Sequence, residues 1–160
     1  MNLFTILSVL SASPETDVEA VIDRMHQAAS RADGQDYFNQ FTPDARFIGT
    51  DATERWSLTA FRAYAEPYFA RGRGWTYVPR ERTVTIAPVE CRCVAWFDEI
   101  LDNASYGQVR GSGVLRLTDD GWKIEQYVLS FAIPNDLADA VAHTIKGYET
   151  DRPAAGSAAE

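Results

Sequence analysis

The feature that most constrains the fold is a change of hydrophobic period after residue 74. From there on, apolar residues alternate with polar ones, which is typical of strands with one buried face. Four long strands are predicted, over residues 75–87, 91–101, 105–117 and 122–133. Asp102-Asn103 and Asp120-Gly121 are turn sequences between them. Consecutive strands with such short connections form an antiparallel meander.

The part of the chain before these strands has the spacing of helices. Apolar residues three and four apart predict a helix over residues 16–32, and Tyr37, Phe38 and Phe41 mark a short second helix. Pro43-Asp44 should end that segment, before a short strand over residues 45–50.

Two further helices are predicted. Ser57 is a typical N-cap for a helix with an apolar face from Leu58 to Phe69, and Pro67 predicts a kink or restart inside it. Three apolar residues at helical spacing near the end predict a short final helix: Leu137, Val141 and Ile145.

This order of elements predicts an α+β fold. Helices that precede a long antiparallel sheet must cover one of its faces. Because long strands twist and coil, the sheet should curl around the helices into a cone. The open mouth of such a cone is a natural pocket for a small molecule.

Length and composition fit one domain. The chain has 160 residues, of which 46% are hydrophobic, enough for a core of its own. We expect the domain to span residues 15–146. Residues 1–14 form an N-terminal extension with a short signal-like apolar run, and residues 147–160 read as a disordered tail with few large apolar groups.

The charge of the chain argues against two classes of partner. A formal net charge of -8 repels nucleic-acid phosphates and anionic membrane surfaces. The apolar run near the N-terminus has no basic residue before it and is too short to span a bilayer. We therefore expect a cytoplasmic protein without nucleic-acid or membrane partners, with export to the periplasm or beyond as the alternative.

The sequence predicts neither a metal nor an organic cofactor. It has no phosphate-binding loop and only two histidines, His26 and His143, which with no third ligand do not make a metal site. Cys91 and Cys93 lie two apart in a predicted strand, a spacing that seldom suits a disulfide, so we interpret them as two buried thiols.

Several short motifs together resemble SnoaL-like domain proteins of the nuclear transport factor 2-like (NTF2-like) superfamily. The motifs are Gly49-Thr50-Asp51, Glu54-Arg55-Trp56, Gly74-Trp75, Trp96-Phe97-Asp98-Glu99, Gly111-Ser112-Gly113-Val114-Leu115, Gly121-Trp122-Lys123-Ile124 and Ser130-Phe131-Ala132-Ile133-Pro134-Asn135. The resemblance covers roughly residues 18–135. It implies a cone-shaped fold and a homodimer with a pocket in each cone. It does not fix a reaction, because members of this superfamily include enzymes, binding modules and assembly domains.

Glu99 is the first candidate for a catalytic residue. It lies in an apolar strand and shares one face with Ala95, Phe97 and Leu101. If that face lines the cavity, desolvation would raise the pKa of Glu99 and make it a usable general base. The alternative is a salt bridge with Arg110 or Arg116 on the neighbouring strand.

Asp51 is the second candidate, because it follows a short strand at a plausible pocket rim; a turn or capping role is the alternative. Tyr64 and Tyr68 lie one helical turn apart and could donate hydrogen bonds to a ligand, or pack with their hydroxyls in water.

The remaining pocket candidates are aromatic or polar residues on predicted inner faces: Trp56, Phe97, Gln126 and Ser130. In the last predicted strand, alternation places Gln126 and Ser130 on the same face as Trp122 and Ile124. For each of these residues, packing in the core or against a partner is the alternative.

Three functions remain open on these observations. The first is a small-molecule-binding domain. The second is an enzyme without a cofactor that isomerises, dehydrates or cyclises a small substrate with a carboxylate as base. The third is an interaction or assembly domain whose cone is filled by its own side chains.

Overall fold

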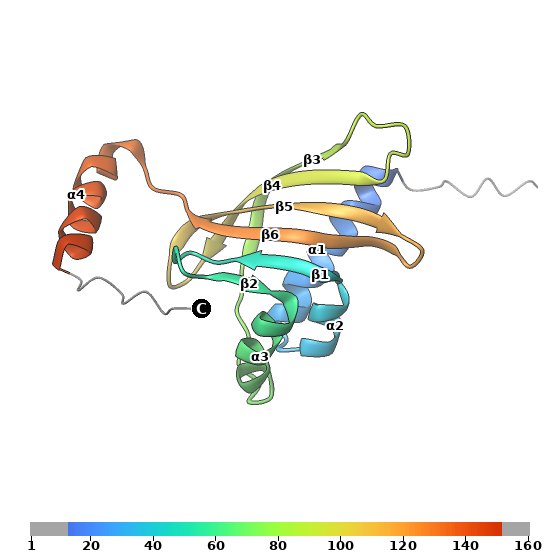
Figure 1. Ribbon diagram of the computed structural model, residues 1–160, viewed down its shortest axis with the longest axis horizontal. Helices are drawn as coiled ribbons and strands as arrows, with labels where there is room; N and C mark the ends of the chain where they lie inside the picture. The colour runs from blue at the N-terminus through green and yellow to red at the C-terminus, as the bar shows by residue number, and fades with distance from the viewer. Residues whose placement is uncertain (1–12, 152–160) are drawn as a thin grey trace, which may run out of the picture.

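The computed structural model describes residues 13–151, so the predictions for residues 1–12 and 152–160 lie outside the described part of the chain. Figure 1 shows the elements in order. They are α1 (Pro14–Ser30), α2 (Gly34–Asn39), β1 (Phe41–Ile48), β2 (Arg55–Ser57), α3 (Leu58–Phe69), β3 (Val78–Ile86), β4 (Val94–Asn103), β5 (Gly107–Thr118), β6 (Gly121–Phe131) and α4 (Asn135–Asp151).

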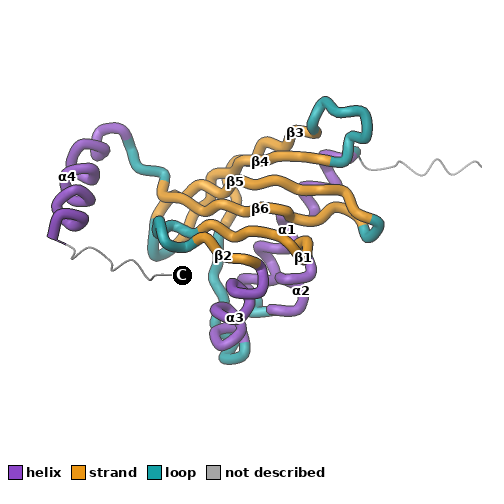
Figure 2. Tube along the Cα trace, viewed as in Figure 1, coloured by secondary structure: helices purple, strands orange, loops and turns teal. Residues whose placement is uncertain are grey.

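All six strands belong to one sheet, in the order β2-β1-β6-β5-β4-β3 (Figure 2). Strands β3 to β6 form the predicted antiparallel meander. β1 pairs with β6 in parallel, and β2 pairs antiparallel with β1 at the edge. The first strand of the chain therefore lies beside the last, and the segment that follows α2 adds β1 and β2 to that edge of the meander.

Helices α1, α2 and α3 lie on one side of the sheet, while α4 extends away from its end (Figure 1). The inner face of the sheet packs against these helices in a single hydrophobic core, which includes Ile22, Tyr37, Phe61, Leu101 and Ile124. In contrast, none of the residues of α4 is buried. The predicted α+β cone, its four long strands and the N-cap at Ser57 are therefore confirmed.

The sequence interpretation was wrong around Pro43. Phe41 and Pro43 lie in β1 rather than at the end of a helix. Pro43 is exposed at the point where the pairing of β1 with β6 is irregular, between Phe41 and Arg46. A proline that lacks an amide hydrogen is tolerated in a strand where the ladder is interrupted.

Two helix boundaries also differ from the prediction. α3 continues through Pro67 as one element and ends at Phe69. Pro67 is only two positions from that end, so it removes a single hydrogen bond of the last turn. α4 runs to Asp151, five residues into the segment 147–160 that we expected to be a tail.

The interpretation of the cysteines as buried thiols was wrong. Cys91 and Cys93 form a disulfide in the loop before β4, with their Cα atoms 5.1 Å apart. The prediction assumed strand geometry, in which side chains two apart run parallel. Instead Arg92 has a left-handed backbone, with φ of 46°, which turns the chain and brings its two neighbours together.

Candidate functional site

Glu99 lies at the centre of the interior face of β4. The alternation predicted for this strand is confirmed, because Ala95, Phe97, Glu99 and Leu101 are buried and Trp96 and Asp98 are exposed. Glu99 has only 1% of its surface exposed. A carboxylate this deeply buried requires partners for its charge.

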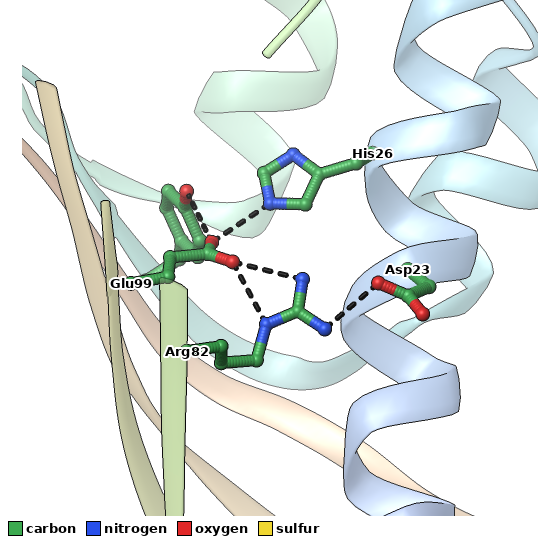
Figure 3. A network of polar contacts seen from close by, with 5 residues as sticks. Asp23, His26, Arg82 and Glu99 are labelled. Atoms are coloured by element: carbon green, nitrogen blue, oxygen red, sulfur yellow. Dashed lines mark hydrogen bonds and ion pairs between the residues drawn. The ribbon is translucent and has the colours of Figure 1, made fainter. Parts of the chain in front are cut away.

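Figure 3 shows the partners of Glu99. Its Oε1 atom lies 2.7 Å from Nε2 of His26 and accepts a hydrogen bond of 3.2 Å from the hydroxyl of Tyr127. Its Oε2 atom accepts a hydrogen bond of 2.9 Å from Nε of Arg82, whose Nη2 lies equally close. Arg82 in turn donates from Nη1 to Asp23 over 2.7 Å. Both carboxylate oxygens are therefore occupied.

The predicted salt bridge exists, but with other partners than expected. Arg82 is directly opposite Glu99 on β3 and shares its face. Arg110 pairs with Ile100 and Arg116 with Val94 in the sheet, so both arginines belong to the outer face. The prediction considered only one of the two strands that flank β4.

The surroundings of Glu99 favour its ionised form. Burial alone raises the pKa of this carboxyl group, as we expected. The hydrogen bond from His26, the positive charge that His26 carries when it is protonated, and the charge and hydrogen bond of Arg82 together outweigh burial, so the pKa of Glu99 falls below its ordinary value. The expectation of a raised pKa was therefore wrong, and Glu99 is not suited to accept a proton at neutral pH.

His26 presents its imidazole ring to the interior beside Glu99. It lies on the buried face of α1, one turn after Ile22, and 7% of it is exposed. Because the carboxylate of Glu99 is an acceptor, Nε2 of His26 carries a proton. The second ring nitrogen points away from Glu99 (Figure 3). His26 and Tyr127 line a small internal cavity of about 10 Å³, together with Tyr77 and Trp75.

A larger pocket opens beyond this internal cavity, at the mouth of the cone. It has a volume of about 470 Å³ and lies between α3, the β1–β2 and β4–β5 turns and the segment 74–77. We call it the mouth pocket. Four residues line both the pocket and the internal cavity: Phe47, Trp75, Tyr77 and Leu129. Seven of its sixteen lining residues are aromatic, and Glu54 supplies a carboxylate.

The structure places the predicted aromatic residues at different depths. Trp56 and Tyr64 line the mouth pocket, with their rings 4.8 Å apart. Tyr68 packs on Tyr64 at 5.4 Å and is 42% exposed. Phe97 is in the core beside Tyr127, with ring centroids 6.0 Å apart, and belongs to neither cavity.

Asp51 lies in the exposed turn between β1 and β2. Its Oδ1 atom accepts hydrogen bonds from the backbone and hydroxyl of Thr53, at 2.8 and 2.6 Å. It is not among the residues that line the mouth pocket, whereas Thr50 and Glu54 on either side of the turn are. This geometry is the turn role that we considered as its alternative.

The assignment of Gln126 and Ser130 to the inner face was wrong. Ile124 pairs with Leu115 and Gln126 with Val114, so Glu125 is an extra residue in β6. This bulge reverses the alternation after Ile124. Trp122 and Ile124 point inward, and so do Tyr127 and Leu129. Gln126 and Ser130 consequently lie on the outer face.

Sequence reasoning missed His26, Arg82 and Tyr127 as partners of Glu99. His26 was considered only as a metal ligand and set aside because the sequence offers no third ligand, although it is adjacent to Met25 on the apolar stripe of the first helix. Arg82 and Tyr127 can be recognised as partners of Glu99 only once the register of β3 and the bulge of β6 are known.

Neither a metal-binding cluster nor a membrane-spanning helix is found in the described part of the chain. Residues 13–151 contain no group of three or more His, Cys, Asp or Glu side chains placed to hold a metal ion. None of the helices in this range is long and apolar enough to cross a membrane.

Residues 18–134 match the model of the SnoaL-like domain family. The chain belongs to this family. No curated protein matches this SnoaL-like chain in sequence. Many solved structures share its fold, and all those described here are below 20% identical to it, a level at which the likeness shows the fold alone.

Two of these structures are proteins of unknown function, one described as NTF2-like and the other as a domain with a cystatin-like fold. The protein from Pseudomonas putida KT2440 is 18% identical, with a TM-score of 0.61 over 75% of this chain and 87% of its own. The domain from Nostoc punctiforme PCC 73102 is 16% identical, with a TM-score of 0.64 over 88% and 94% of the two chains.

A third structure comes from Streptomyces avermitilis. It is an NTF2-like family protein for which a dehydratase activity is suggested. It is 16% identical to this chain, with a TM-score of 0.62 over 76% of this chain and all of its own.

Proposed function

We propose that this SnoaL-like domain binds a small, flat organic molecule in the mouth pocket and moves a proton on it. The observation that carries the proposal is His26, which is held on Nε2 by an ionised Glu99 and borders an internal cavity that shares four lining residues with the mouth pocket. His26 is the acid–base group. Glu99, which we first considered as the base, is the positioning residue.

Each neighbour of His26 has a defined part in this arrangement. Glu99 fixes the proton on Nε2, so a neutral ring presents an unprotonated Nδ1 on its other side. When Nδ1 accepts a proton, the ring becomes positive, and the adjacent carboxylate stabilises that charge. Arg82 keeps Glu99 ionised, and Asp23 holds Arg82 in place.

The pocket favours a substrate with an aromatic or alicyclic body and a carbonyl group. Trp56, Phe61 and Tyr64 offer flat apolar surfaces for the body. Tyr77 and Tyr127 lie beside His26 in the internal cavity, and burial raises the pKa of the Tyr77 hydroxyl to about 12. The Tyr77 hydroxyl therefore stays protonated and can donate to a carbonyl or enolate oxygen, while the Tyr127 hydroxyl donates its proton to Glu99. Abstraction of a proton beside a carbonyl, followed by isomerisation or loss of water, fits these groups and requires no cofactor.

A specific observation favours a second candidate, ligand binding without turnover. The internal cavity beside His26 has a volume of only about 10 Å³, room for about one water molecule. Phe47, which lines both the internal cavity and the mouth pocket, stacks on Phe61 with ring centroids 3.9 Å apart. A ligand held in the mouth pocket would then reach His26 only if these rings move.

Hydrogen–deuterium exchange on carbon distinguishes the two candidates. A panel of cyclic ketones and hydroxy acids is first screened for thermal stabilisation of the protein, and the hits are incubated with it in D₂O. If His26 abstracts a proton, NMR of the ligand shows loss of the C–H signal beside the carbonyl. His26→Gln should still bind the ligand but lose exchange, while His143→Gln, on exposed α4, should behave as wild type.

Other outcomes would contradict the proposal. Binding without exchange in the wild type would favour the binding module. Exchange that persists in His26→Gln would show that another group is the base. No binding across the panel would favour the filled cone of an assembly domain.

A further inference from the structure

We propose that the Cys91–Cys93 disulfide is a site of thiol–disulfide exchange, separate from the mouth pocket and independent of the function proposed above. The disulfide lies in the loop between β3 and β4. This loop projects from the end of the sheet opposite to α4, beside the start of α1 (Figure 1).

The disulfide is not needed to hold this loop together. It joins residues separated by one position, so it closes a very short loop and removes little entropy from the unfolded chain. The backbone already fixes the loop through three hydrogen bonds, from Ala87 to Val94, from Arg92 to Val89 and from Leu117 to Cys93, at 2.8 to 2.9 Å. A structural staple would be redundant here.

The backbone between the two cysteines favours the reduced form. Arg92 has a φ of 46°, in the left-handed region that is unfavourable for a residue with a Cβ atom. Reduction releases Arg92 from this conformation. The guanidinium of Arg92 lies 3.8 Å from the carboxylate of Glu15 and still adds positive charge between the two cysteines, which favours the thiolates that reduction produces. Both effects make the disulfide easier to reduce than an unstrained structural one.

A thiol can reach the disulfide from one side. Cys91 is exposed, whereas Cys93 is half-buried at the start of β4. Cys91 and Arg92 border a groove of about 610 Å³ between α1 and the β5–β6 hairpin. Val21, Leu117 and Trp122 supply apolar surface in this groove. The groove therefore fits a thiol that carries an apolar group, such as a cysteine within an extended peptide.

The exchange reaction balances with thiols alone. A thiolate of the substrate attacks Sγ of Cys91, a new S–S bond forms, and the bond between the two cysteines breaks with Cys93 leaving as a thiolate. A second thiol then attacks the substrate sulfur of this mixed disulfide and releases Cys91. Two thiols are oxidised to one disulfide, the protein gains two electrons, and the two protons of the thiols pass to the cysteines. In the reverse reaction the two cysteines reduce a substrate disulfide to two thiols and are themselves oxidised to the disulfide.

The first test is the redox equilibrium of the full chain. The oxidised protein is equilibrated with glutathione buffers of increasing reduced fraction, quenched with acid, alkylated and weighed by mass spectrometry. The proposal predicts a reversible transition from disulfide to dithiol while circular dichroism shows a folded chain. A disulfide that opens only when the protein unfolds would overturn it, and so would two free thiols after air oxidation.

Substitutions at Arg92 test the backbone argument. Arg92→Gly removes both the charge and the strain, whereas Arg92→Ala removes the charge and leaves the strain. Arg92→Gly should therefore need a several-fold more reducing buffer than Arg92→Ala for half-reduction. Equal midpoints would overturn the argument from strain. The double variant Cys91→Ser/Cys93→Ser should melt at the wild-type temperature, and a clear loss would show a structural disulfide.

Two thiol peptides test the groove and distinguish a protein substrate from a small thiol. The rate of mixed-disulfide formation is measured with Leu-Cys-Trp and Gly-Cys-Gly peptides on Cys93→Ser, after activation of Cys91 as its nitrothiobenzoate disulfide. A several-fold preference for the apolar peptide, lost in Leu117→Asp, would support a peptide substrate. Equal rates would overturn the role of the groove.

Discussion

At the scale of residues, the interior of this SnoaL-like domain is organised around one carboxylate. Glu99 is buried and receives its hydrogen bonds from three elements, α1, β3 and β6. A buried charge is tolerated only where partners replace its hydration. The four side chains therefore hold one another in place, and His26 is oriented as a consequence.

Glu99→Gln tests this dependence. The amide removes the buried one of the two carboxylates that pair with Arg82 and leaves only the half-exposed Asp23, and we expect the free energy of unfolding to fall by about 3 kcal/mol. Urea denaturation followed by circular dichroism measures it. Asp98→Asn is the matched control on the same strand, because Asp98 is exposed and should change stability by less than about 0.5 kcal/mol. Equal effects at the two positions would contradict a central role for Glu99.

The same variant should alter the response to acid. The pKa of Glu99 is lower in the folded state than in the unfolded chain, so its contribution is complete above about pH 4.3 and is lost as the pH falls through the folded value. Wild-type stability should therefore decline in this acid range. Glu99→Gln should lack that part of the decline, and parallel acid limbs would contradict the sign of the shift.

How far the site could be predicted follows from sequence distance. The face of Glu99 was predictable, because alternation within one strand is a local property. Its partners were not, because Arg82 and His26 are 17 and 73 residues away in sequence. Only the register of β3 and the packing of α1 bring them together, and neither leaves a periodic pattern in the sequence.

At the scale of elements, β5 makes room for the Glu99 network. Gly111 is opposite Glu99 in the sheet. A Cβ atom at this position would lie 2.5 Å from the hydroxyl of Tyr127 and 2.7 Å from Oε1 of Glu99. The strand therefore requires glycine here because two polar groups occupy the space of a side chain.

Gly111→Ala should lower the free energy of unfolding by about 1 to 3 kcal/mol, because the added methyl group forces Tyr127 and Glu99 to move. Thermal melting measures this loss. Gly147→Ala on α4 is the control, since a Cβ there meets nothing within 4 Å and alanine favours a helix. A Gly111→Ala variant as stable as wild type would show that the network yields without cost.

Irregularities of one to three residues explain the remaining errors of the sequence interpretation. The strands were predictable from alternation, but the bulge at Glu125 reversed it and moved Gln126 and Ser130 to the outer face. β2 has only three residues, too few for a periodic pattern. The left-handed Arg92 that joins the cysteines is likewise a single-residue feature.

At the scale of the whole molecule, the outer face of the sheet has no helix on it among residues 13–151 (Figure 2). Trp96 is 45% exposed on this face and pairs with Val114, while Val128 lies on the next strand. Exposed apolar patches of this kind mark interaction surfaces. We propose that a second copy covers this face, as the family resemblance implies.

Light scattering after gel filtration tests this proposal. The wild type should have twice the mass of one chain, and Trp96→Asp should have the mass of one chain while it keeps its circular dichroism spectrum. Tyr148→Asp on exposed α4 is the control and should stay dimeric. A wild type with the mass of one chain would contradict the dimer.

The orientation of His26 by Glu99 is the central claim, and long-range ¹H–¹⁵N NMR of the two histidines measures it directly. In the neutral ring, we predict that His26 carries its proton on Nε2 and that Nδ1 is unprotonated. In Glu99→Gln this preference should weaken, while the signals of His143 stay unchanged. A proton on Nδ1 of His26 in the wild type, or a ring that averages between both forms, would contradict the account.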